Sequence, residues 1–137
     1  MLKTMLLDKS NKKLIKEIKD ILINWENSNT DILDDIATIT LLDDDNLIGF
    51  YRIVLHDNDN TNYAPWIANI YIKENYRNKG NGRYLINTIP NYLEKLNISN
   101  IYLHTRHENF YEKFGWHLLQ PLDLHDGIKR NIYALKK

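Results

Sequence analysis

The spacing of apolar residues near the start of the chain is that of a helix with one buried face. Residues 1–7 are apolar enough for a short strand, and the helical pattern begins after Ser10, whose side chain has the chemistry of an N-cap. The apolar positions are Leu14, Ile15, Ile18, Ile21, Leu22 and Trp25. They predict an amphipathic helix that ends near residues 27–29.

Alternation of apolar and polar residues, which is typical of strands, follows this helix. It predicts strands at Ile36–Leu42, Leu47–Leu55 and Trp66–Ile72. The first two should pair as a hairpin, because the polar tract Asp43–Asn46 between them has turn chemistry. The polar run His56–Tyr63 is expected to form a loop.

After residues 73–79 the pattern changes to that of a second helical face. The residues spaced along one side of this helix are Leu85, Ile89, Tyr92 and Leu96. Pro90 lies within the pattern and predicts a kink, because proline has no backbone N–H to donate.

The last third of the chain predicts short elements. Ile101–His104 is expected to be a strand, and Asn109–Phe114 a short helix that ends at Gly115. Two further strands are expected at Trp116–Gln120 and Ile128–Leu135. Because no repeat, linker or change of composition divides the sequence, we expect a single α/β domain over residues 1–137.

The composition is close to that of an average globular protein. Of the 137 residues, 43% are hydrophobic and 26% are charged, with 18 basic and 18 acidic side chains. Nucleic-acid binders usually carry a basic excess, so no nucleic-acid partner is expected. No apolar run has the length of a membrane span or of a signal-peptide core, so we expect a cytoplasmic protein without a membrane partner. The absence of cysteine excludes disulfides, thiolate metal sites and a cysteine nucleophile.

A basic loop between a predicted strand and a predicted helix carries the strongest chemical signal. It reads Arg77-Asn78-Lys79-Gly80-Asn81-Gly82-Arg83. The first amides of a helix have no intrahelical acceptor and lie at the positive end of the helix dipole. Glycines let the backbone approach an anion closely, and the three cations add charge. The loop therefore favours a phosphate or diphosphate site, with an ordinary surface turn as the alternative.

Two common phosphate motifs do not fit this loop. A dinucleotide fingerprint would need a third glycine where Leu85 stands, and a Walker A loop would need Gly-Lys followed by Ser or Thr.

The loop resembles the Arg/Gln-x-x-Gly-x-Gly/Ala signature of the Gcn5-related N-acetyltransferase (GNAT) superfamily. The block 109–116, Asn-Phe-Tyr-Glu-Lys-Phe-Gly-Trp, is similar to the family's Phe-Tyr-Glu-Lys-x-Gly-Phe/Trp segment, and Pro65-Trp66-Ile-Ala is similar to one subgroup of small bacterial members. The resemblance runs from about Leu47 to the C-terminus. It implies a mixed, mostly antiparallel central sheet flanked by helices, with splayed parallel fourth and fifth strands. It also implies an enzyme that transfers acetyl groups from acetyl-CoA to a primary amine without a metal.

The resemblance further implies roles for individual residues. In the family the loop amides bind the coenzyme A pyrophosphate, and the preceding strand bonds the pantetheine. The implied cofactor-binding residues are Ile70, Tyr71, Ile72, Arg77, Asn78, Lys79, Gly80, Asn81, Gly82 and Arg83. The amide of Ile70 is the expected partner of the acetyl carbonyl. Tyr111 matches the family's tyrosine that protonates the departing thiolate, although its ring could instead serve only to pack the short helix.

The general base is left open. Holding a lysine-like amine neutral at pH 7 costs roughly 4–5 kcal/mol, so a base or a water relay has to assist. Some family members use a glutamate on the fourth strand, but Trp66 stands there, and no Asp or Glu occurs from Pro65 through Lys73. The candidate bases are His56, Asp57, His104, Glu108 and His125. Without cysteine, direct attack of the amine in a ternary complex is favoured over an acetyl-enzyme.

Four residues are expected to face the acceptor. They are His56, Trp66, Asn69 and His104. The loop His56–Tyr63 is expected to form a further part of the wall of the acceptor pocket. At Trp66 and in the loop, core or loop packing is the alternative. His104-Thr-Arg-His107-Glu108 matches neither zinc-binding helix motif, so no metal is expected.

Two other functions remain open at this point. A non-catalytic acetyl-CoA sensor would keep the basic loop without needing Tyr111, and a phosphate-binding or protein-interaction module would have no affinity for coenzyme A. For the enzyme, a small-molecule or peptide amine is the expected acceptor, and the sequence indicates no oligomeric state.

Overall fold

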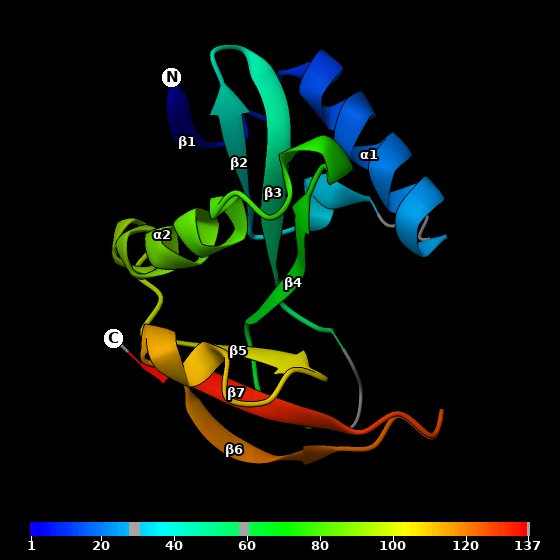
Figure 1. Ribbon diagram of the computed structural model, residues 1–137, viewed down its shortest axis with the longest axis vertical. Coiled ribbons are helices and arrows are strands. Elements are labelled where there is room, and N and C mark those ends of the chain that lie inside the picture. The colour runs from blue at the N-terminus through cyan, green and yellow to red at the C-terminus, as the bar shows by residue number, and fades with distance from the viewer. Residues whose placement is uncertain (28–30, 58–60, 137) are drawn as a thin grey trace. The chain divides into compact units, whose positions relative to one another are not determined.

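The computed structural model describes residues 1–27, 31–57 and 61–136 (Figure 1). Within them, seven strands form one sheet in the order β1-β2-β3-β4-β5-β7-β6. The strands are β1 (Leu2–Leu6), β2 (Ala37–Asp43), β3 (Asn46–Val54), β4 (Trp66–Ile72), β5 (Asn100–Thr105), β6 (His117–Leu122) and β7 (Arg130–Lys136). The helices are α1 (Lys12–Glu26) and α2 (Asn81–Lys95), with short 3₁₀ helices η1 (Ile32–Asp34), η2 (Glu74–Tyr76) and η3 (Tyr111–Phe114).

The pairing of the strands confirms the predicted mixed, mostly antiparallel sheet. The pairs β1–β2, β2–β3, β5–β7 and β6–β7 are antiparallel, whereas β4 and β5 are parallel. The parallel pairing joins Trp66 to Tyr102. The predicted splaying of β4 from β5 stays a prediction, as does the kink at Pro90, which lies inside α2.

The chain forms two compact units. The first unit comprises Met1–Ile53 and Asn69–Leu85, and the second comprises Val54–Ala68 and Ile86–Lys137. Strand β4 and helix α2 each pass from one unit into the other. The end of the first predicted helix, at 28–30, and the middle of the His56–Tyr63 loop, at 58–60, lie outside the described residues.

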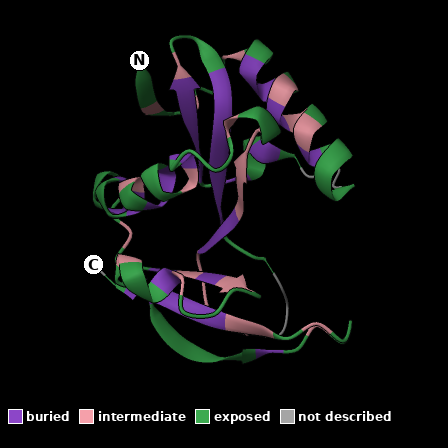
Figure 2. Ribbon diagram, in the orientation of Figure 1, coloured by how far each residue is buried: buried purple, intermediate pink, exposed green. Residues whose placement is uncertain are grey.

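Helix α1 packs an apolar stripe onto the core of the first unit. Its buried residues Leu14, Ile15, Ile18 and Leu22 join Ile32, Leu42, Leu47 and Phe50 in one cluster. In Figure 2 the buried stripe on α1 alternates with its exposed side. The N-cap is Asn11, whose Oδ1 accepts from the Leu14 amide at 3.2 Å, and not the predicted Ser10. Ser10 instead donates its amide and hydroxyl to Asp8, because a carboxylate two residues before it accepts both.

Strands β3 and β4 approach each other closely at Gly49. A Cβ at this position would lie 2.6 Å from the Tyr71 carbonyl oxygen and 2.6 Å from the end of the Ile72 side chain. The Lys73 amide donates to the Ile48 carbonyl at 2.8 Å, which holds the end of β4 against β3. The ring of Tyr71 then packs between Phe50 and Trp25, with centroids at 5.6 and 4.8 Å.

In the second unit, the register of β5 with β7 sorts side chains onto two faces. His104 pairs with Ile132, and Tyr102 pairs with Ala134, so their side chains share one face. We call this the aromatic face, because the Trp66 ring lies there, 5.9 Å from Tyr102 and 6.0 Å from His104. Its core holds Val54, Trp66, Ala68, Leu122 and Ile132.

The opposite face of β5 and β7 carries Leu103 and Tyr133, which also pair directly. Helix η3 lies against this face, in front of β7 in Figure 1, where Glu112 accepts from the Tyr133 hydroxyl at 3.4 Å. Gly115 ends η3 in the left-handed conformation, at φ 88°, as the sequence predicted for this position.

No helix among the described residues combines the length and apolarity that crossing a membrane requires.

We predict that Gly49→Ala destabilises the protein by about 1–3 kcal/mol, because the new methyl group collides with backbone of β4 that packing holds in place. Urea unfolding followed by circular dichroism measures the change. Gly82→Ala is the matched control, since nothing lies within 4 Å of a Cβ there and alanine favours a helix. Equal stability of Gly49→Ala and wild type would contradict this account of the β3–β4 contact.

Candidate functional site

The segment that follows β4 in the first unit is held by contacts of its own side chains. Arg77 donates from Nε to the Ile72 carbonyl at 2.7 Å, and its guanidinium lies 5.4 Å from the centroid of the Tyr71 ring. Asn81 is buried and donates from Nδ2 to the Tyr76 carbonyl at 2.8 Å. These contacts fold residues 73–80 back over the end of β4 before α2 begins.

Two residues of this loop have a left-handed backbone. Asn78 and Gly80 have positive φ angles of 61° and 83°. The Tyr84 amide makes the first helical bond, to the Gly80 carbonyl at 3.0 Å, so the amides before it have no intrahelical acceptor. The space beside Gly82 is open, because nothing lies within 4 Å of a Cβ there. These amides and this open space are the features that a phosphate group would need, and the binding role of the loop stays a prediction.

Three cationic residues lie close in sequence to these amides, and the side chains of all three are exposed. Arg77 is anchored at β4, Lys79 lies with Nζ 6.0 Å from the Tyr76 ring centroid, and Arg83 projects from the first turn of α2. Exposed cations beside helix N-terminal amides favour a multiply charged anion such as a diphosphate.

Asn69 interrupts β4 with a left-handed backbone, at φ 57°. Its Oδ1 accepts from Arg52 Nη1 at 2.7 Å, and its Nδ2 donates to Glu26. Arg52 is itself buried and donates to both oxygens of Asp35, at 2.7 and 2.8 Å. Burial raises the pKa of Asp35, and its hydrogen bonds from Arg52 oppose that rise. The Asn69 side chain was predicted to face the acceptor, but in this structure it spans Arg52 and Glu26.

Tyr111 is buried on the face of β7 that carries Tyr133. Its ring lies 6.1 Å from the Tyr133 ring and 6.0 Å from the Trp116 ring, edge-on to the latter. Burial raises the pKa of Tyr111 to about 12. The phenol is therefore protonated throughout the neutral range, as a proton donor to a thiolate must be.

Two of the predicted acceptor-facing residues lie together on the aromatic face of the second unit. The Trp66 indole donates to the Tyr63 carbonyl at 2.7 Å, which fixes its ring beside His104. His104 Nε2 lies 2.7 Å from Asp57 Oδ2, and the two side chains are 22% and 26% exposed. The sequence named both as candidate bases but gave no sign that they pair.

The remaining candidate bases show no comparable arrangement in the described residues. His56 and Glu108 are exposed. His125 is 83% exposed and lies 3.6 Å from Asp123 through Nδ1, in the turn before β7.

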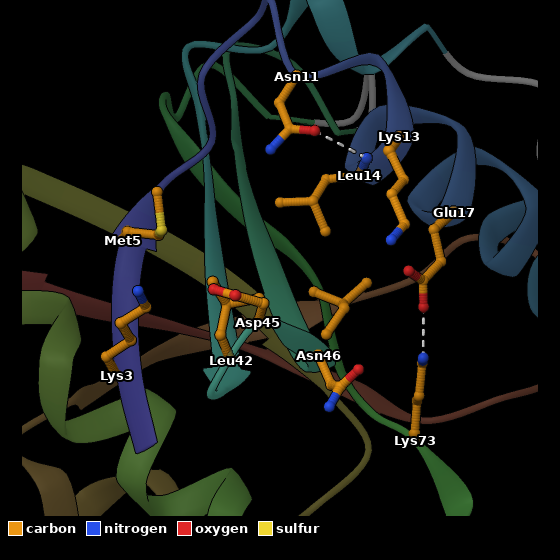
Figure 3. A pocket seen from close by; sticks show the side chains of 11 residues that line it. Lys3, Met5, Asn11, Lys13, Leu14, Glu17, Leu42, Asp45, Asn46 and Lys73 are labelled. Carbon is orange, nitrogen blue, oxygen red and sulfur yellow. Dashed lines mark hydrogen bonds and ion pairs between the residues drawn. The ribbon is translucent and has the colours of Figure 1, made fainter. Parts of the chain in front are cut away.

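A separate pocket of about 440 Å³ lies in the first unit (Figure 3). It is lined by the apolar Met5, Leu14, Leu42 and Leu47, and by Lys3, Asn11, Lys13, Glu17, Asp45, Asn46 and Lys73. Lys73 and Glu17 form an ion pair at its side. None of the predicted site residues lines this pocket.

Among the described residues, no three His, Asp or Glu side chains gather closely enough to hold a metal ion.

A family model described as an acetyltransferase (GNAT) domain matches residues 34–118. The chain belongs to the GNAT acetyltransferase family. The matched residues include β2 to η3 and therefore the basic loop and Tyr111. Acetyl-CoA is the co-substrate of this family, and the loop amides, open space and cations described above fit its diphosphate.

Solved structures of several GNAT proteins have the same fold. The aminoglycoside 6'-N-acetyltransferase from Enterococcus faecium has 16% sequence identity and a TM-score of 0.76, with 98% of this chain and 96% of that chain covered. Arabidopsis thaliana Naa50 in complex with the bisubstrate analogue CoA-Ac-MVNAL has 18% identity and a TM-score of 0.68, with 99% of each chain covered. A Bacillus subtilis acetyltransferase in complex with CoA has 20% identity and a TM-score of 0.65, covering 100% of this chain and 99% of that one. Comparison with curated protein sequences gave no match.

Sequence reasoning missed the buried pair of Arg52 and Asp35 in this GNAT domain. A signal existed, because Arg52 interrupts the apolar run of β3. A charged side chain in a buried strand requires a partner of opposite charge, but its identity depends on tertiary structure.

We predict that Arg52→Met lowers the free energy of unfolding by about 3–5 kcal/mol, because it leaves Asp35 buried without its partner. The carboxyl pKa in the folded state then lies still further above its unfolded value, so the deficit should shrink as the pH falls toward about 4. Urea unfolding at several pH values measures both effects. Lys16→Met is the control, since the Lys16–Asp20 pair is exposed and its loss should leave stability close to that of wild type. A pH-independent deficit would contradict the assignment of the effect to Asp35.

We predict that Gly82→Leu weakens coenzyme A binding more than about tenfold, because a side chain there fills the space that the diphosphate needs. Isothermal titration calorimetry with coenzyme A measures the affinity, and thermal unfolding should be little changed. Asn87→Leu places the same side chain at an exposed position of α2 and serves as the control. Wild-type affinity in Gly82→Leu would rule out the loop as the diphosphate site.

Proposed function

We propose that this GNAT protein transfers the acetyl group of acetyl-CoA to a primary amine by direct attack within a ternary complex. The observation that carries the proposal is the loop from Arg77 to Arg83, in which helix amides without an intrahelical acceptor, open space at Gly82 and exposed cations combine. The chain contains no cysteine that could hold the acetyl group, so the amine attacks the thioester itself.

The loop amides and cations bind the diphosphate of acetyl-CoA, and the end of β4, Ile70–Ile72, bonds the pantetheine arm. Support for the strand's role comes from the contacts at its end. Gly49 lets β3 lie close to the Tyr71 carbonyl, and Arg77 donates to the Ile72 carbonyl. The Ile70 amide follows the left-handed Asn69, where the strand departs from regular pleating, and is assigned to the acetyl carbonyl.

Tyr111 is the general acid of the proposed reaction. The amine nitrogen forms a bond to the carbonyl carbon, the carbon–sulfur bond breaks, and the thiolate takes the phenolic proton. A simple thiol has a pKa of about 8.5, well below the value of about 12 to which burial raises the pKa of Tyr111. Tyr111 therefore carries its proton when the thiolate forms. Because the phenol is the weaker acid of the two, the transfer is uphill, and it is completed as solvent returns a proton to the phenolate.

The acceptor is a small-molecule or peptide amine, and the reaction takes place in the cytoplasm. The proposal for the acceptor is supported by the related structures, which include an aminoglycoside 6'-N-acetyltransferase and Naa50 in complex with a peptide-linked CoA analogue. No finding favours the non-catalytic sensor.

The experiment that tests this function measures release of free coenzyme A from acetyl-CoA. The purified chain is offered kanamycin, spermidine and the peptide Met-Val-Asn-Ala-Leu, and mass spectrometry identifies the acetylated amine. Acetylation of any of the three supports the function. Coenzyme A release no faster than in the absence of protein, for all three, would contradict it.

With an acceptor in hand, we predict that Tyr111→Phe lowers kcat by about 10²-fold or more, because the departing thiolate loses its proton donor. KM for acetyl-CoA should change little, since the ring and its packing are retained. Tyr133→Phe removes a hydroxyl from the neighbouring ring and should keep near wild-type kcat. Full turnover in Tyr111→Phe would remove the phenol from the mechanism and leave its ring a packing role.

A further inference from the structure

His104 and Asp57 form a side-chain pair that the proposed transfer step has not used. His104 ends β5, and Asp57 lies in the loop that follows β3. Nε2 and Oδ2 are 2.7 Å apart, and each side chain keeps roughly a quarter or less of its surface exposed. A carboxylate that accepts from Nε2–H leaves the lone pair of the neutral ring on Nδ1. The carboxylate thus orients the imidazole ring and leaves the other nitrogen, Nδ1, free to accept a proton, as the aspartate does for the histidine of a catalytic triad.

The ring of His104 packs beside Trp66 and pairs with Asp57. Trp66 from β4 lies edge-on at 6.0 Å, and Ile132 from β7 stands opposite it in register. Among the described residues, Asp57 is the charged partner that His104 contacts, and Trp66 is its ring neighbour. Of the other three candidates, His56 and Glu108 are exposed, and His125 is 83% exposed with the carboxylate of Asp123 at 3.6 Å.

The faces of the second unit separate this pair from the proposed acid. His104 shares the aromatic face with Trp66 and Tyr102, whereas Tyr111 contacts Tyr133 on the other face. Attack on a thioester carbonyl brings the amine to one side of the carbonyl plane, and a base for the amine must be on that side. A base on the aromatic face and an acid on the face of Tyr133 can therefore serve two different atoms, the amine nitrogen and the departing sulfur.

We propose that His104, oriented by Asp57, is the general base that takes the proton of the acceptor amine; this assignment rests on the proposed function. As the nitrogen–carbon bond forms, the amine's N–H proton moves to Nδ1 of His104, directly or through one water. The carbon–sulfur bond then breaks and the thiolate takes the proton of Tyr111. The products are the acetamide and coenzyme A, and the imidazolium returns its proton to solvent. Asp57 is a positioning residue, since it acts only through the ring.

The test uses the full chain and the best acceptor among kanamycin, spermidine and Met-Val-Asn-Ala-Leu. In wild type, kcat/KM for the amine should fall on the acid side of the profile measured over about pH 5.5–9.5 as the base becomes protonated. In His104→Gln, kcat/KM should be about 10²-fold lower and this acid limb should be lost. Binding of coenzyme A by calorimetry should be unchanged. His107→Gln, at an exposed histidine three residues further on, should keep both the rate and the limb.

Asp57→Asn separates positioning from folding, since it keeps the size of the side chain. It should lower kcat/KM by less than His104→Gln does, and it should have no further effect in the double variant, because Asp57 acts through His104. Added imidazole should restore part of the activity of His104→Ala.

Each outcome decides between the two levels of the proposal. Wild-type protein that acetylates none of the amines contradicts the proposed function and the base assignment with it. Active wild-type protein together with a His104→Gln variant that keeps its rate and acid limb overturns the base assignment alone. Additive losses in the double variant of Asp57 and His104 overturn the pairing. A His104→Gln variant that unfolds leaves the decision to Asp57→Asn and its pH profile, where a wild-type rate and limb would likewise overturn the assignment.

Discussion

The buried guanidinium of Arg52 sets the local structure on which the first unit depends. A charge inside the core is stable only when its hydrogen bonds are met, and here Asp35 and Asn69 meet them. Asn69 supplies its oxygen from a left-handed position in β4, so the irregularity of that strand and the burial of the charge support each other. The amide of Ile70 comes directly after this irregularity. The position assigned to the acetyl group is thus tied, through one side chain, to the core between η1 and β3.

Most of the fold followed from local patterns that tertiary structure did not override. Trp66–Ile72 was predicted with its observed ends, because alternation in β4 is bounded by proline on one side and a charged loop on the other. The N-cap of α1 was placed one residue early, since Ser10 and Asn11 are both good caps and only the nearby Asp8 decides between them. The short helix η1 was missed, because three residues carry too little periodicity to be read.

The candidate site divides in the same way between local and distant information. The basic loop could be predicted because its glycines, cations and helix start are contiguous in sequence; its role as the diphosphate site stays a prediction. Tyr111 was found through the family resemblance and not through its spacing. The pairing of His104 with Asp57 joins residues 47 positions apart in the sequence across a loop, and no local pattern encodes such a contact. Asn69 could be named from its place in the strand, but its partners Arg52 and Glu26 could not.

The alternation of side chains between the two faces of β5 and β7 has a consequence for how the catalytic groups regain their protonation states between turnovers. The side chains of Tyr133 and Ile132 point to opposite faces of β7. The phenol of Tyr111 and the imidazole of His104 therefore lie on opposite sides of the sheet backbone. In the proposed reaction neither group can hand its proton to the other to complete the cycle. Each group must exchange its proton with bulk water by its own route, so the enzyme returns to its starting protonation state through two independent proton exchanges. Restricting water at the nearly closed phenol side would then slow recovery even when the imidazole side stays wet.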